Sequence, residues 1–399
     1  MKKLLVPVLA VAITAIAATS AQALPHSSAQ GLSHRNACGV PAAGSAHCDA
    51  KVVTTASGDT FNAAPDATTG TPAGWGPADL QSAYNVPAAS GAPTVAIVDA
   101  YDDPNADANL ATYRAQYGLS ECSTANGCFK KVNQSGSTSS YPAADSGWAE
   151  EISLDLDMVS SACPSCHILL VEANTNSFAN LMTAVTTAAA TPGVVAVSNS
   201  YGGNEFSTET SYDSNFSKAG VAFTVSSGDS GYGPEYPAAS RNVVATGGTS
   251  LSRATTARGW SETAWSGAGS GCSSYESKPS WQTDRGCARR TIADVSSVSD
   301  PNTGVAVYDN YGGDPGWMVF GGTSAAAPFI AGVYAVGGVP STPAAQKPYL
   351  ATSGLNDVTS GSNGRCANKR NSSQAYLCTA GVGYDGPTGL GTPNGVTAF

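Results

Sequence analysis

Histidine is scarce in this chain of 399 residues, which contains only four: His26, His34, His47 and His167. Three of them lie in a polar stretch near the N-terminus. His167 opens the apolar run His-Ile-Leu-Leu-Val, which is typical of a strand. An imidazole base must be held beside the hydroxyl that it activates, and none of these four positions has such a context. Hydrolytic chemistry at a serine would therefore need a carboxylate base.

Positive charge is also scarce. Charged residues make up 12% of the chain, with 19 Lys and Arg against 29 Asp and Glu, so the net charge is −10. Nucleic-acid binding requires a basic surface, which this composition does not supply, so nucleic acid is excluded as a partner. We expect a monomer.

Long apolar runs are absent except at the N-terminus. Lys2 and Lys3 precede an apolar stretch from Leu4 to about Ala18, and Ala21-Gln22-Ala23 supplies small residues for cleavage. This order is typical of a secretory signal peptide, which we assign to residues 1–23. No other segment reaches the roughly 20 apolar residues that a membrane span needs. The sequence therefore predicts a secreted, extracellular protein without membrane contact once the signal is removed.

The ten cysteines fit an oxidising compartment. They occur as neighbours along the sequence, and we expect local disulfides, although spacing alone does not fix connectivity. The third pair lies in Cys163-Pro-Ser-Cys166, which a redox or metal site would also explain. The expected pairs are Cys38/Cys48, Cys122/Cys128, Cys163/Cys166, Cys272/Cys287 and Cys366/Cys378.

The hydrophobic pattern divides the rest of the chain in two. Residues 24–72 have no sustained period, and we interpret them as a loosely folded leader and possible propeptide. Residues 73–399 form one domain in which apolar strands alternate with helices. This predicts an α/β fold, a doubly wound sheet of mainly parallel strands with helices on both faces. The expected strands are 94–99, 167–173, 194–198, 221–226 and 243–246, and the expected helices are 106–117, 146–161, 177–190 and 324–336.

Ser324 is the candidate nucleophile. It lies in Phe-Gly-Gly-Thr-Ser-Ala-Ala-Ala-Pro-Phe-Ile-Ala-Gly, residues 320–332, at the start of an alanine-rich helix. The glycines allow a substrate backbone to approach closely, and the start of a helix favours negative charge that develops beside it. This setting is typical of a serine nucleophile.

Three acids are candidates to act with Ser324. Glu151 and Asp155 lie four residues apart, so on a helix they share a face, and their mutual repulsion would raise one pKa. Asp229 follows a buried strand, at the sheet edge where open α/β folds place their reaction sites. From spacing alone, a solvated acidic helix face and an ordinary turn aspartate remain alternatives.

A second group of oxygens lies near the C-terminus. Asp357 and Val358 are followed by the glycine-rich run of residues 380–391, which contains Asp385. Two carboxylates together with carbonyls exposed in glycine turns could hold Ca²⁺, and a metal-free turn is the alternative.

Taken together, these motifs resemble the sedolisins, the serine-carboxyl peptidases, over residues 74–399. The resemblance implies a subtilisin-like fold and a secreted, acid-acting endopeptidase that cleaves proteins or peptides. It implies that Ser324 is the nucleophile, Glu151 its base, Asp155 the residue that orients Glu151, and Asp229 the group that faces the oxyanion. It also implies one structural Ca²⁺ with Asp357, Val358, Gly381, Gly383 and Asp385 as ligands. The motifs that carry the resemblance are Gly322-Thr-Ser-Ala-Ala-Ala-Pro328, Glu151-x-x-Leu-Asp155, Ser227-Gly-Asp229, Tyr236-Pro-Ala, Gly247-Gly-Thr249, Glu262-Thr-Ala-Trp265, Asp294-Val-Ser, Asp300-Pro-Asn-Thr-Gly304 and the Asp357/Asp385 region.

One departure and two alternatives accompany the resemblance. Sedolisins usually carry a large folded prodomain, whereas only residues 24–72 precede the predicted domain here. A subtilisin-type protease would use Asp99 at the end of the first strand, but it also needs a histidine, and only His167 lies in the required interval. A secreted binding protein on an inactive peptidase scaffold is the other alternative.

Overall fold

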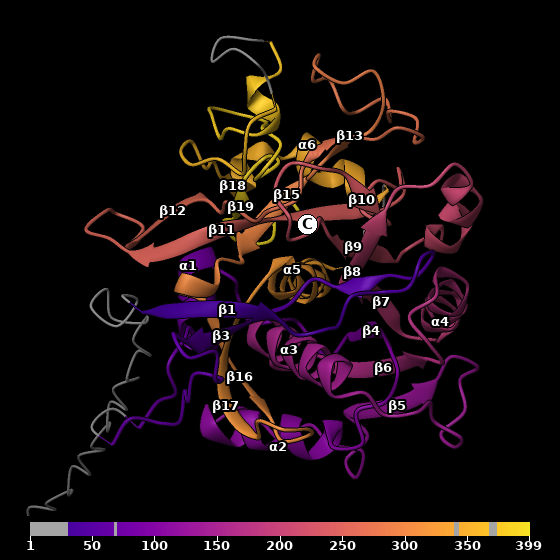
Figure 1. Ribbon diagram of the computed structural model, residues 1–399, viewed down its shortest axis with the longest axis vertical. Coiled ribbons are helices and arrows are strands. Elements are labelled where there is room, and N and C mark those ends of the chain that lie inside the picture. The colour runs from indigo at the N-terminus through magenta and orange to yellow at the C-terminus, as the bar shows by residue number, and fades with distance from the viewer. Residues whose placement is uncertain (1–30, 68–69, 339–342, 367–372) are drawn as a thin grey trace, which may run out of the picture.

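A computed structural model describes residues 31–67, 70–338, 343–366 and 373–399. The predicted signal peptide, residues 1–23, lies outside the described residues. An eight-stranded sheet forms the centre of the molecule, in the order β12-β11-β9-β7-β4-β6-β5, with β15 beside β11 (Figure 1). All neighbours in this sheet are parallel except β11 and β12. The predicted parallel α/β sheet is therefore confirmed. Its strands are β4 (Thr94–Ala100), β5 (Phe129–Asn133), β6 (His167–Ala173), β7 (Val194–Asn199), β9 (Ala222–Ser226), β11 (Val244–Arg253), β12 (Trp260–Ala264) and β15 (Val295–Val298).

Helices cover both faces of this sheet. Helices α3 and α5 pack against each other, and α5 crosses the middle strands, while α4 contacts β4, β6 and β7 from the other side (Figure 1). Local signals fix two of the starts, because Asp145 accepts a hydrogen bond from Trp148 N and Ser177 from Asn180 N. No helix within the described ranges has the length and apolar character to cross a bilayer. The helices are α1 (Pro77–Tyr84), α2 (Ala106–Gln116), α3 (Ser146–Ala162), α4 (Phe178–Ala190), α5 (Thr323–Gly337) and α6 (Lys347–Leu350), with a 3₁₀ helix at Glu209–Phe216.

The leader is folded onto the domain in its described part, so the prediction that it is loosely folded was wrong. β3 (Lys51–Thr55) pairs with β1 (Leu32–Asn36) on one side and with β17 (Gly316–Gly321) on the other. β17 in turn pairs with β16 (Val305–Asp309). Val52 is fully buried, as is Ala46. Apolar burial and strand pairing therefore hold the leader, although its sequence shows no period.

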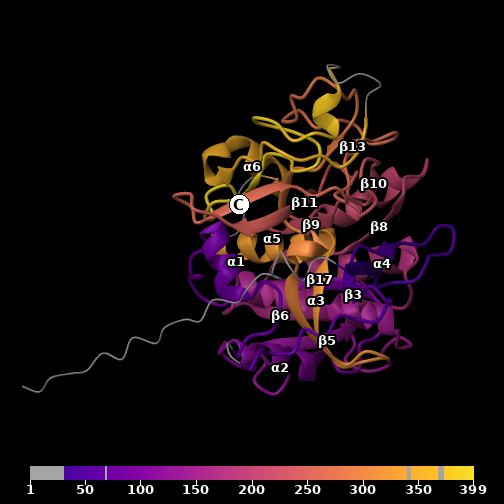
Figure 2. The ribbon, with the colours of Figure 1, turned by 60° about the vertical axis from the view of Figure 1, so that its left-hand side comes forward.

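The remaining strands are short, and several lie at one end of the molecule. The segments after α5 and the loops between β13 and β14 gather there in both views (Figures 1 and 2). The bounds are β2 (His47–Cys48), β8 (Tyr201–Asn204), β10 (Glu235–Tyr236), β13 (Gly271–Cys272), β14 (Thr291–Ile292), β18 (Leu355–Asn356) and β19 (Thr392–Pro393).

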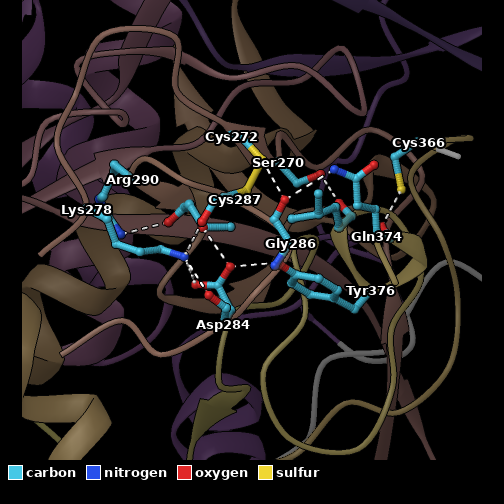
Figure 3. The surroundings of a disulfide bond; sticks show 12 residues. Ser270, Cys272, Lys278, Asp284, Gly286, Cys287, Arg290, Cys366, Gln374 and Tyr376 are labelled. Carbon is cyan, nitrogen blue, oxygen red and sulfur yellow. Dashed lines mark hydrogen bonds and ion pairs between the residues drawn. A yellow bond between two sulfur atoms is a disulfide. The ribbon is translucent and has the colours of Figure 1, made fainter. Parts of the chain in front are cut away.

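All five predicted disulfides are present, each between consecutive cysteines. Figure 3 shows the surroundings of Cys272–Cys287. Gly286 N donates to the Tyr376 hydroxyl over 2.9 Å, and this hydroxyl donates to Asp284 Oδ2 over 2.6 Å (Figure 3). These contacts join the Cys272–Cys287 loop to the segment closed by Cys366–Cys378.

Candidate active site

The predicted residues come from three elements that meet at the carboxyl edge of the sheet. Glu151 and Asp155 lie on α3, Ser324 is the second residue of α5, and Asp229 follows β9. Glu151, Asp155 and Ser324 are fully buried. Every residue of α3 from Trp148 to Ala162 is buried as well, which overturns the alternative of a solvated acidic face.

The Ser324 hydroxyl lies beside the Glu151 carboxyl. Burial first, and then the charges of Asp155 and Asp99, raise the Glu151 pKa well above its ordinary value, while the neighbouring Ser324 hydroxyl lowers it in part. The Ser324 Oγ also donates to the carbonyl of Ser200 over 3.3 Å. Neither Glu151 oxygen has a well-aligned hydrogen-bond partner among the described residues, and such loose geometry is common before substrate binds.

Ser200 connects Asp155 to this pair. Its hydroxyl donates to both Asp155 oxygens, at 2.7 and 2.9 Å, while its carbonyl accepts from Ser324. Burial raises the pKa of Asp155 well above its usual range, and the charge of Asp99 adds to this. The hydrogen bonds from the Ser200 hydroxyl and the neighbouring Glu151 carboxyl lower this pKa in part.

Asp99 is the third buried acid of this cluster. It ends β4, is fully buried, and neither of its oxygens has a hydrogen-bond partner in the described part of the chain. Burial raises its pKa to about 8, and its charge would raise the pKa of both Glu151 and Asp155. No ion pair among the described residues compensates these three acids, so they cannot all ionise at low cost and the cluster takes up protons readily.

Asp229 lies at the start of α5. Its Oδ1 accepts hydrogen bonds from Thr323 N at 2.7 Å and from Thr323 Oγ1 at 3.1 Å. Oδ2 is buried, has no hydrogen-bond partner within the described ranges, and lies 3.8 Å from Lys51 Nζ. Burial first, and then the charge of Asp49, raise the Asp229 pKa to about 7. At acidic pH, Oδ2 is therefore the oxygen available to carry the proton.

The leader crosses this site, as the indigo segment in front of α3 and α5 in Figure 1 illustrates. Asp49 N donates to Ser200 O over 3.3 Å, and Ser324 N donates to Asp49 O over 3.0 Å. Arg35 holds Glu150, the neighbour of Glu151, through two hydrogen bonds of 2.6 and 2.9 Å. The leader therefore contacts the residues around Ser324 through both backbone and side-chain hydrogen bonds.

Sequence reasoning missed Asp49, Ser200, Ser226 and Glu235, all of which lie in or beside this site. Ser200 had a usable signal, because it follows a buried strand and precedes Tyr201-Gly-Gly, at the same sheet edge as Asp229. Asp49 had none, because Ala-His-Cys-Asp-Ala shows neither strand alternation nor a motif.

Four of the five predicted metal ligands, Asp357, Gly381, Gly383 and Asp385, are joined in pairs by hydrogen bonds near the C-terminus. Gly383 N donates to Asp357 Oδ2 over 2.9 Å, and Gly381 N to Asp385 Oδ2 over 3.0 Å. Val358 follows Asp357 and is buried. Burial raises the Asp385 pKa to about 7, and the charge of Asp357 adds to the shift. No ion pair of the described residues neutralises either aspartate. Two adjacent carboxylates without a basic partner fit a hard cation.

Comparison with known proteins finds relatives among the peptidases that the sequence motifs resemble. No family model matches the chain. It is 33% identical to sedolisin of Pseudomonas sp. (strain 101) over 207 residues, which is 43% of this chain and 33% of that protein. It is 30% identical to kumamolisin of Bacillus sp. (strain MN-32) over 372 residues, or 82% of this chain and 63% of that protein. With xanthomonalisin of Xanthomonas sp. (strain T-22) it shares 30% identity over 189 residues, or 40% and 21%. The chain thus spans less than two thirds of the length of each relative.

A solved structure matches the fold of this chain closely. The structure of Pseudomonas sedolisin, a serine-carboxyl proteinase complexed with two molecules of pseudo-iodotyrostatin, superimposes with a TM-score of 0.66 and 27% identity. The match covers 80% of this chain and 95% of that one. The sequence similarities and the fold therefore agree: they support the sedolisin family, and the chain has a subtilisin-like fold.

Proposed function

We propose that this chain is a secreted serine-carboxyl endopeptidase that hydrolyses peptide bonds in acid, with Ser324, Glu151, Asp155 and Asp229 as its catalytic set. The observation that carries the proposal is the placement of the Ser324 hydroxyl beside the buried Glu151 carboxyl. Its sedolisin relatives and their match in fold support the same activity. The five disulfides and the lack of a membrane-spanning helix in the described ranges are compatible with secretion.

In the proposed reaction, Ser324 Oγ attacks the peptide carbonyl and passes its proton to Glu151. Glu151 then protonates the leaving amine, and a water molecule, activated in turn by Glu151, hydrolyses the acyl-enzyme. Asp155, fixed by the Ser200 hydroxyl, orients Glu151. Burial first, and then the charge of Asp155, raise the Glu151 pKa, so its ionised form is a stronger base than an ordinary carboxylate and can hold the serine proton until the amine leaves.

The oxyanion would accept hydrogen bonds from Ser324 N and from the protonated Asp229 carboxyl. A carboxyl can donate only while it is protonated, and its pKa of about 7 leaves Asp229 protonated in acid. Loss of one such donor typically costs about 3–4 kcal/mol of transition-state stabilisation.

A calcium ion is part of the proposal. Asp357 and Asp385 would hold it with their carboxylates, and Val358, Gly381 and Gly383 with their carbonyls. The ion would neutralise two adjacent carboxylates and tie the loop after β18 to the run before β19.

The alternatives predict different behaviour. A subtilisin-type enzyme needs an imidazole on the nucleophile, but among the described residues the hydrogen bond of Ser324 Oγ goes to Ser200 O and not to a histidine. An inactive binding protein would release no peptides. The test is digestion of a denatured protein between pH 3 and pH 5. Wild type should release peptides, and Ser324→Ala should lose at least about 10³-fold in rate. Equal cleavage by Ser324→Ala would remove Ser324 from the mechanism, and no cleavage by wild type would favour the binding protein.

A further inference from the structure

Residues 46–52 lie in the site as an extended peptide. On one side, β2 pairs with β8, with Cys48 opposite Tyr201 and His47 opposite Gly202. On the other side, β3 pairs with β17, with Lys51 opposite Gly321 and Val52 opposite Phe320. Asp49 and Ala50 join these two ladders directly in front of Ser324. A peptide held by backbone pairing on both sides of a nucleophile has the arrangement of a bound substrate.

The carbonyl of Asp49 occupies the position that the reacting carbonyl would take. It accepts a hydrogen bond from Ser324 N, while Asp49 N donates to Ser200 O. A Cβ atom on Gly322 would stand 2.1 Å from the Asp49 oxygen and 2.7 Å from Asp229 Oδ2. The carbonyl and the Asp229 carboxyl thus flank the same glycine, whose φ of +98° and missing side chain make room for both.

The Asp49 side chain is held in a polar pocket. Ser226 Oγ donates to its Oδ2 over 2.6 Å, and His47 Nε2 lies 3.2 Å from its Oδ1. His47 Nε2 also lies 3.5 Å from Glu235 Oε2, and both Asp49 and the Glu235 carboxyl are buried. Burial opposes protonation of His47, but these carboxylates outweigh it and raise its pKa to about 9. The buried Asp49 carboxylate is thus hydrogen-bonded by Ser226 and paired with His47, and the pocket holds this residue in one register.

We propose that residues 46–52 are the chain's own first substrate and that Asp49–Ala50 is the bond that it cleaves. This inference rests on the proposed function and names the site at which that activity first operates. It also assigns the pocket formed by Ser226 and Glu235 to the side chain that precedes the scissile bond.

The reaction balances with water as the only co-reactant. Ser324 Oγ forms a bond to the Asp49 carbonyl carbon, and its proton moves to Glu151. The bond from that carbon to Ala50 N breaks, and the nitrogen takes the proton from Glu151 and leaves as a free amine. Water then adds to the acyl carbon, Ser324 Oγ regains a proton, and Asp49 ends with a new carboxylate.

The cut would not need to break any covalent tie between the two parts. Cys38 and Cys48 both precede the scissile bond, so their disulfide stays within the released piece. That piece is also held by the pairing of β1 with β3 and of β2 with β8, and by the ion pair of Arg35 with Glu150.

Three full-length proteins test this proposal: wild type, Ser324→Ala, and Ser57→Ala as the matched control at an exposed leader serine. Each is transferred from neutral pH to pH 4 and followed by intact mass after reduction and by N-terminal sequencing. Wild type and Ser57→Ala should gain a new N-terminus at Ala50, while Ser324→Ala should stay uncut. Because the peptide is already seated, the half-time should not change over a tenfold range of protein concentration.

Digestion of a denatured protein in trans, measured in parallel, separates the two proposals. Trans cleavage with an uncut leader, a new N-terminus elsewhere, or cleavage of Ser324→Ala at the same bond would overturn the self-cleavage site. A half-time inversely proportional to concentration would overturn the seated geometry. Failure of both reactions would overturn the proposed function itself.

Discussion

Asp99 offers the sharpest test of the electrostatics of the buried acids. It is fully buried, and its folded-state pKa of about 8 lies far above its ordinary value of 3.8 because burial disfavours its charge. A carboxyl with a raised pKa binds its proton more tightly in the folded than in the unfolded protein. Its protonation therefore stabilises the fold fully below about pH 4, and this contribution is lost as the pH rises toward about 8.

The size of the effect follows from the shift. One pKa unit corresponds to 1.36 kcal/mol, so the loss between pH 4 and pH 8 is at most roughly 5 kcal/mol for Asp99 alone. Asp99→Asn should abolish this loss, because an amide of nearly the same shape does not ionise. At pH 4 the variant and its parent should differ by only about 1 kcal/mol, since a protonated acid and an amide both leave polar atoms unpaired in this pocket. At pH 8 the variant should be the more stable protein.

The assay is denaturant unfolding at several pH values between 4 and 8, in a Ser324→Ala background that prevents self-digestion. Asp59→Asn, at an exposed position, is the control and should follow its parent at every pH. Asp99→Asn also removes the charge that raises the pKa of Glu151 and Asp155, so the difference between the two profiles reports the coupled titration of all three acids. Parallel free-energy profiles for Asp99→Asn and its parent would refute the assignment of a raised pKa to Asp99.

Two further changes test the site and the metal. Glu151→Gln should lower the rate of peptide cleavage by about 10²–10⁴-fold, because it removes the proposed base, whereas Glu150→Gln should stay within about threefold of wild type. The reverse order, measured on the same denatured protein, would mean that the base is Glu150. Removal of calcium by a chelator should lower the melting temperature, because two adjacent carboxylates lose their counter-ion, and Asp385→Asn should make the protein insensitive to the chelator. An unchanged melting temperature of wild type in chelator would count against the metal site.

Five strands of the central sheet, β4, β6, β7, β9 and β11, were predictable because each contains an apolar run, whereas the more polar β5, β12 and β15 were not predicted. The strand predicted at 167–173 matches β6, and the helix predicted at 146–161 differs from α3 by one residue at its end. A parallel strand that is buried on both faces consists mostly of apolar residues, so it can be recognised from its own sequence without knowing the strands beside it.

The leader strands and the β16–β17 hairpin were not predicted. β3 is short, and its partner β17 lies far away in the sequence, so no local pattern reports that pairing. Asp49 and Glu235 were not identified as candidates because they meet residues that lie far from them in the sequence. By contrast, Ser324, Glu151 and Asp229 stand in local motifs, and the structure brings these residues together at one edge of the sheet.

The pattern of disulfides has a consequence for how this chain is oxidised. Each bond joins a cysteine to the next one along the chain, and no two partners are more than 15 residues apart. Ten cysteines could be joined in about nine hundred ways, but a chain that emerges from its N-terminus meets each correct partner before any later cysteine arrives. Native pairing then follows from the order of emergence, with no need for a shuffling catalyst. Cross-links of this kind tie single loops instead of distant parts, so the sheet and its buried helices must hold the remote segments together.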